Sequence, residues 1–272
     1  MADPPVLFRS GTDRLQVESP HEGVLLVTMN RPEARNAVSF EMWQGFSGLL
    51  DQLERETPVR ALVLTGAGGT FSTGGDMKIP PARGEGALSP AARLEWGQRV
   101  IARLRRLPIP VIAAIEGGAW GIGWSLALAC DLVFAAEDAR FGAPFVNVGL
   151  APDGGSCWLL GRQLGRRRAA ELLLSGRNID ATEALSLGLV SRLCPAGAAV
   201  EAAVEFARTI GGGNRHAVEL TRRLLHAADD GGSLEASHAL ELAYCAILQR
   251  GDELQRARAA FADRAAARKK TT

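Results

Sequence analysis

The chain has 272 residues, of which 47% are apolar and 22% charged, and its formal net charge is +1. This composition is typical of a folded globular protein with a sizeable core, and it excludes an intrinsically disordered chain. Because the charge is nearly balanced and no apolar run approaches the ~18 residues that span a bilayer, we expect neither a nucleic-acid partner nor a membrane partner.

The first half of the chain alternates strand patterns with helix patterns. Apolar or alternating runs at 14–19, 23–30 and 59–66 predict three strands. Between the last two, apolar residues recur every three or four positions over 39–56, which predicts a helix capped by Ser39. The elements predicted next are a helix over 95–107, a strand over 109–118, a helix over 124–131 and a strand over 132–137. This alternation predicts a layered α/β core.

Two segments fall outside this alternating pattern. Pro80–Arg93 combines proline, glycine and charge, so we expect a surface loop there, with a lid over a ligand as the alternative. After residue 203 the chain reads as helices, which predicts a core over 1–203 and an appendage over 204–272. The appendage would pack against the core or against another subunit.

The cysteines and the N-terminus indicate a cellular compartment. The four cysteines show no C-x-x-C spacing and lie in or beside apolar runs, which favours buried reduced thiols over zinc ligands or disulfides. The first residues show neither a signal peptide nor a presequence pattern. We therefore expect a cytoplasmic protein. The four histidines form no ligand spacing, so we expect no metal site.

Two glycine-rich turns follow predicted strands, at 65–78 and 116–131. The first lacks the Gly-Lys-Ser/Thr of a phosphate loop, and the second lacks the third glycine of a dinucleotide fingerprint. Each turn can point backbone amides at an anion, and two such turns can supply one donor each to a single oxygen. The pair therefore predicts an oxyanion hole.

Several segments, taken together and in order, resemble the crotonase superfamily, the enoyl-CoA hydratase/isomerase family. They are NRPEARNAVSFEMW, GTFSTGGDMK, PVIAAIEGGAWGIGWSLALACDLVFAAEDARFGAPFVNVGLAPDGGS and LLLSGRNIDATEALSLGLVSRL. The resemblance implies an α/β fold built as a crotonase-like spiral of ββα units, with a C-terminal α-helical trimerisation region. It also implies an acyl-CoA substrate, no cofactor apart from the coenzyme A of that substrate, and a homotrimer or a hexamer of two trimers.

The resemblance also assigns roles to residues of this chain. The oxyanion amides would be those of Gly75 and Ile122, although the family often has glycine at the second position. The residues expected near the substrate or its coenzyme A are Arg35, Ala37, Gly74, Asp76, Lys78, Gly121, Phe145 and Arg264. For the charged members, a solvated surface position or, for Asp76, a structural loop contact is the alternative.

The chain departs from the family hydratases at both catalytic glutamates, which are replaced by Ser125 and Phe145. Neither replacement can act as the carboxylate acid or base that hydration requires. Taken alone, the Pro-Asp-Gly at Asp153 is a turn signature. The segment GLAPDGG, however, resembles the one that carries the single working acid in isomerase branches of the family, so Asp153 becomes the candidate catalytic residue. Apolar neighbours Phe145, Val146 and Trp158 would raise its pKa by excluding water.

The sequence therefore predicts an enzyme that shifts a double bond in an acyl-CoA thioester, with Asp153 as proton shuttle. The alternatives are a hydratase, another reaction that uses the same hole (thioester hydrolysis, ring opening or decarboxylation), and a non-catalytic acyl-CoA-binding protein. The tryptophans Trp120, Trp124 and Trp158 would line an acyl pocket or pack in the core.

Overall fold

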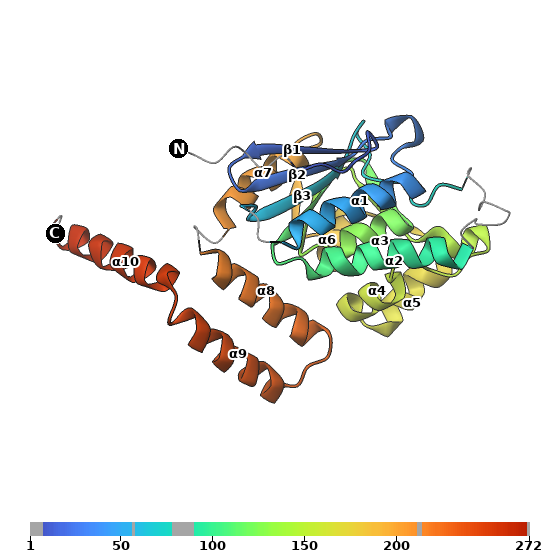
Figure 1. Cartoon of the computed structure of the whole chain (residues 1–272). Coiled ribbons are helices and arrows are strands. Elements are labelled where there is room, and N and C mark those ends of the chain that lie inside the picture. Colours follow the sequence, from blue (N-terminus) through green and yellow to red (C-terminus); the bar gives the residue numbers. More distant parts are fainter. Residues whose placement is uncertain (1–7, 56–57, 78–89, 211–213, 271–272) are drawn as a thin grey trace. The chain divides into compact units, whose positions relative to one another are not determined.

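The computed structural model describes residues 8–55, 58–77, 90–210 and 214–270, without the side chains of 90–93 and 264–270 (Figure 1). The chain divides into two compact units, Met1–Arg208 and Thr209–Thr272. The predicted boundary at 203 falls inside a helix, α7 (Ala199–Thr209), whose Ala203 and Ala207 are buried in the first unit.

The first unit contains two sheets. The larger has the order β1-β2-β3-β4-β6-β9, in which only the β1–β2 pair is antiparallel. Its strands are β1 (Leu15–His21), β2 (Val24–Met29), β3 (Ala61–Gly66), β4 (Val111–Ile115), β6 (Leu132–Ala136) and β9 (Arg192–Cys194). The smaller sheet pairs β5 (Gly118–Trp120), β7 (Arg140–Gly142) and β8 (Asn178–Asp180). Every residue of β4 is buried, as expected for a central parallel strand.

Helices connect the parallel strands and cover the sheet (Figure 1). Ser39 caps α1 by accepting a hydrogen bond from the Met42 amide at 3.3 Å, which confirms the predicted start of this helix. Helices α1 and α2 pack together, and the Phe40 and Trp96 rings meet edge to face at 4.9 Å. The helices of this unit are η1 (Pro32–Ala34), α1 (Phe40–Leu53), α2 (Pro90–Arg106), α3 (Ile122–Leu128), η2 (Pro144–Val148), α4 (Ser156–Leu164), α5 (Arg166–Ser175), α6 (Ala181–Ser186) and α7.

The layered α/β core predicted from the alternating patterns is thus confirmed, although part of the predicted loop is helical. Helix α2 begins at Pro90, so residues 90–93 are helical rather than part of a loop. Residues 80–89, which include the rest of the expected loop or lid, lie outside the described part of the chain.

The prediction that the cysteines are buried is wrong for Cys157. This residue is exposed on α4, because that helix buries Ser156, Leu159 and Leu160 instead.

The second unit consists of α8 (Arg215–Asp229), α9 (Leu234–Leu248) and α10 (Asp252–Lys270). His216 Nδ1 and Glu253 Oε1 lie 3.1 Å apart and link α8 to α10. No residue of α9 is buried, and Cys245 on this helix is exposed, contrary to the prediction of buried thiols. Large apolar side chains also lie exposed across the unit: Leu225, Leu234, Leu242, Ile247 and Phe261. In the part of the chain that the structure describes, no helix is long and apolar enough to cross a bilayer.

Candidate active site

The two glycine turns predicted to form an oxyanion hole lie side by side. Ser72 in the first turn accepts a hydrogen bond from the Trp120 amide at 2.9 Å and donates its own amide to the Gly118 carbonyl at 3.3 Å. A Cβ at Gly121 would lie only 3.7 Å from the Gly74 Cα. Both Gly74 (φ 102°) and Gly121 (φ 52°) adopt positive φ, which other residues rarely do, and this close approach depends on them.

Among the described residues, the amides of Gly75 and Ile122 have no hydrogen-bond partner at this junction. The Val38 amide bonds to the Gly74 carbonyl and the Asp76 amide bonds to the Val38 carbonyl, so the peptides on either side of Gly75 are anchored. Ile122 is the first residue of α3, where an amide has no partner within the helix. Within the described residues neither amide donates a hydrogen bond, so both can bind an oxygen.

Asn36 holds the first turn in place, a role that was not predicted from the sequence. It is fully buried with φ 54°, and its side-chain Nδ2 donates to the Ala67 carbonyl at 2.8 Å and the Thr70 carbonyl at 2.6 Å. Its own carbonyl accepts from Ser72 Oγ at 2.8 Å, and that oxygen accepts from the Gly74 amide at 3.2 Å. Nothing in the local sequence pattern indicated these long-range contacts.

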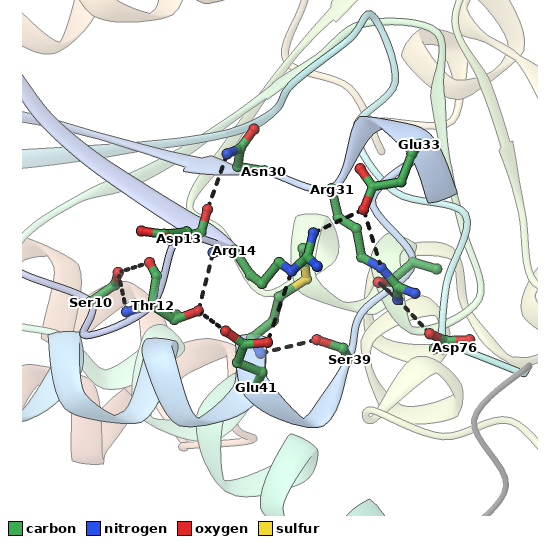
Figure 2. A network of polar contacts seen from close by, with 12 residues as sticks. Ser10, Thr12, Asp13, Arg14, Asn30, Arg31, Glu33, Ser39, Glu41 and Asp76 are labelled. Carbon is green, nitrogen blue, oxygen red and sulfur yellow. Dashed lines mark hydrogen bonds and ion pairs between the residues drawn. The ribbon is translucent and has the colours of Figure 1, made fainter.

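An ion pair braces the residue after Gly75. Figure 2 shows Arg31 reaching Asp76, and a hydrogen bond joins Arg31 Nη1 to Asp76 Oδ2. The same nitrogen donates to the Ala37 carbonyl at 3.3 Å. The Asp76 side chain is only 4% exposed, so this carboxylate serves the loop, as the structural alternative for Asp76 anticipated.

We expect Asp76→Ala to lower the free energy of unfolding by about 1.5–3 kcal/mol, because it removes a charged hydrogen bond from a buried position. The matched control is Glu22→Ala, which breaks the ion pair of Arg60 with a side chain that is 95% exposed and should change stability little. Urea unfolding of both variants measures the difference. Equal stabilities would show that Asp76 does not brace the loop.

Asp153 lies between η2 and α4, on a turn that contacts Ile122. A Cβ at Gly154 (φ 60°) would lie 3.0 Å from Ile122 Cγ1, 3.0 Å from Ile101 Cδ1 and 2.8 Å from Ser125 Cβ. Asp153 Oδ1 is buried and has no hydrogen-bond partner among the described residues. Burial raises the pKa of the Asp153 carboxyl from 3.8 to about 6, against a smaller lowering by a backbone hydrogen bond.

The apolar environment of Asp153 differs from the predicted one. Val146 is 38% exposed, and Trp158 is 43% exposed and lies beneath the Arg105 guanidinium, 4.7 Å from its carbon. Two of the three predicted water-excluding side chains therefore face solvent. The contacts that bury the turn come instead from Ile101 on α2 and Ile122 on α3, two elements far away in sequence.

The structure describes some of the other residues predicted to lie near the substrate, but not all of them. Phe145 is buried, with its ring 3.7 Å from a Cβ built at Gly121. Arg35 is exposed, with φ 48°. Lys78 and the Arg264 side chain lie outside the described part of the chain. Of the tryptophans, Trp124 is buried in the core, and the half-buried Trp120 donates to Asn178 Oδ1 at 3.0 Å.

Comparisons with known proteins show the family to which the chain belongs. Residues 19–270 match the family model described as enoyl-CoA hydratase/isomerase. The chain is 40% identical over 235 residues to "Probable enoyl-CoA hydratase EchA12" of Mycobacterium tuberculosis. The aligned region makes up 84% of this chain and 82% of that protein.

Two solved structures are also similar. The crystal structure of a probable enoyl-CoA hydratase/isomerase from Mycobacterium abscessus is 37% identical with a TM-score of 0.84, covering 93% of this chain and 97% of that one. A monofunctional enoyl CoA isomerase from M. smegmatis is 39% identical with a TM-score of 0.71, covering 84% of this chain and 99% of that one. The chain therefore belongs to the enoyl-CoA hydratase/isomerase family and has the crotonase fold.

Proposed function

We propose that the protein moves a carbon–carbon double bond along an acyl-CoA thioester, with Asp153 as the single acid–base residue. The observation that carries this proposal is the Asp153 carboxyl, whose Oδ1 is buried without a partner on a turn packed against Ile122. Ser125 and Phe145 occupy the positions of the hydratase glutamates, so they leave Asp153 without a second carboxylate to share the work. The similarity to a monofunctional enoyl CoA isomerase is consistent with this choice.

The proposed steps balance without a co-reactant. The Asp153 carboxylate removes a proton from C2 of a 3-enoyl thioester, and the electron pair of that C–H bond forms the dienolate. The thioester oxygen gains negative charge, which the amides of Gly75 and Ile122 stabilise. The protonated Asp153 then returns the proton to C4, the double bond shifts to C2–C3, and the carboxylate is restored. A pKa of about 6 suits both transfers near neutral pH.

The substrate and subunit contacts complete the proposal. Arg35, Lys78 and Arg264 would bind the phosphates or adenine of coenzyme A, and no separate cofactor takes part. The exposed apolar side chains of α8–α10 support an assembly of copies of this chain, a homotrimer or a pair of trimers. A cytoplasmic location stays an expectation from the sequence.

A pair of substrates tests the proposed reaction. Purified protein is incubated separately with a 3-enoyl-CoA and a 2-enoyl-CoA, and the products are separated by chromatography. We expect the 3-enoyl substrate to be converted to the 2-enoyl isomer, without water addition to either. Hydration of the 2-enoyl substrate without isomerisation of the other would contradict the proposal.

A hydratase is the second candidate, favoured by the printed name of the relative EchA12. In that case the buried hydroxyls of Ser125 and Ser156 would have to hold the water, while Asp153 alone moved the protons. The 2-enoyl arm of the same experiment distinguishes this candidate.

A further inference from the structure

Two buried serine hydroxyls contact the backbone carbonyl of Asp153. Ser125 on α3 is fully buried, and Ser156, the first residue of α4, is 2% exposed. Their Oγ atoms lie 2.7 Å apart. Buried hydroxyls this close to each other share a hydrogen, so the pair links the oxyanion helix to the helix that follows Asp153.

The hydrogen positions follow from counting donors. Ser156 Oγ lies 2.7 Å from the Asp153 carbonyl oxygen, whereas Ser125 Oγ lies 3.2 Å from the same oxygen. Each hydroxyl has one hydrogen, so both short contacts are satisfied only if Ser125 donates to Ser156 and Ser156 donates to the carbonyl. The Ser156 amide also donates to this carbonyl, at 3.1 Å. The backbone carbonyl of Asp153 is therefore held by a chain of hydrogen bonds that starts at Ser125 on α3.

Packing reinforces this link. The Cβ position of Gly154 is 2.8 Å from Ser125 Cβ, closer than real Cβ atoms approach, so only glycine fits opposite Ser125. The carboxylate has a backbone hydrogen bond, but its Oδ1 lacks a partner among the described residues. Its position consequently depends on the backbone turn that Ser125 and Ser156 hold.

We propose that Ser125, acting through Ser156, is a positioning residue that sets the place of the Asp153 carboxylate relative to the oxyanion hole. The position of a missing hydratase glutamate is thereby reused to support a different acid. This inference rests on the proposed function of Asp153 and extends it to two buried serines.

The test compares Ser125→Ala, Ser156→Ala, the double variant and Asp153→Asn in the full-length protein. The control is Ser10→Ala, which also removes a serine hydroxyl that donates to a carbonyl, from the partly buried Ser10 Oγ to Thr12 at 2.8 Å, but ahead of β1 and outside the two turns and the Asp153 segment. Isomerisation of a 3-enoyl-CoA is followed across pH, and thermal unfolding confirms that each variant is folded. If Ser125→Ala does not fold, Ser156→Ala breaks the same chain at its other end.

We expect kcat to fall about 10- to 100-fold in Ser125→Ala and in Ser156→Ala with KM little changed, because small displacements of a catalytic group have effects of this size. The acid limb of the pH profile should move to lower pH, since a looser turn admits water and lowers the pKa of Asp153. The double variant should resemble Ser156→Ala alone, because the two hydroxyls act in series. Ser10→Ala should lose stability but keep both kcat and the acid limb.

Two results would overturn the inference, and they differ. Variants of Ser125 and Ser156 that match Ser10→Ala in kcat and pH profile, with Asp153→Asn inactive, would remove the positioning role and leave the proposed function standing. An Asp153→Asn variant with parental turnover would refute the proposed function itself, and the positioning role with it.

Discussion

Replacing Asp153 by asparagine is expected to lower the kcat of double-bond isomerisation by roughly 10²- to 10⁴-fold, the range that general acid–base groups contribute. Asparagine keeps the size of the side chain but cannot take a proton from C2. KM should change little, because the amides of Gly75 and Ile122 still bind the thioester oxygen. The charge-matched control is Asp138→Asn, at an exposed position of the same unit. Parental turnover in Asp153→Asn would exclude Asp153 as the base.

The raised pKa of Asp153 also predicts how activity and stability change with pH. The pKa of Asp153 is raised from 3.8 to about 6 in the folded protein, so the folded state holds this proton more tightly than the unfolded state does. The contribution to stability is therefore greatest below pH 3.8 and is lost as pH rises through 6. We expect the kcat/KM of the parent to fall as pH drops below about 6, and Asp153→Asn to gain stability relative to the parent at pH 7. An acid limb near pH 4 would show that the carboxyl is solvated.

The regular elements were predictable because their signals are local. The helix α1 shows three- and four-residue periodicity behind a serine cap, and the strands β2 and β3 are continuous apolar runs. The short strands β7, β8 and β9 gave no such signal, because three residues are too few to establish a period. Their pairing comes from the tertiary fold.

Some features of the candidate site were likewise predictable from the sequence, and others were not. The two glycine turns and Asp153 stand out in the sequence, and the structure brings the turns together and places the Asp153 turn against Ile122. The supporting contacts of Asn36 and Ser125 join segments about thirty residues apart or more, for which sequence spacing gives no guide. The error over Trp158 has the same origin, since nearness to Asp153 in sequence did not place its side chain on the buried face of α4.

Restoring a glutamate at Ser125 is expected to destroy isomerisation without producing a hydratase. The Ser125 hydroxyl faces three oxygens, those of the Gly121 carbonyl, the Asp153 carbonyl and Ser156, and only the last can donate a hydrogen bond. A carboxylate there would be buried against two carbonyl oxygens, which is unfavourable by several kcal/mol unless the turn moves. Gly154 leaves no room on the other side, so the movement would displace Asp153.

The neutral control Ser125→Gln separates the charge of the glutamate from its size. Both variants should lose isomerisation by at least about 10-fold, since either side chain displaces the turn. Ser125→Glu should also unfold at a lower temperature than Ser125→Gln, because only the glutamate brings a charge into this buried position. Chromatography of products from a 2-enoyl-CoA measures any hydration. Water addition by Ser125→Glu would show that the hole and its surroundings still accept the two-acid reaction, and that Asp153 is not committed to the isomerase role by the packing around it.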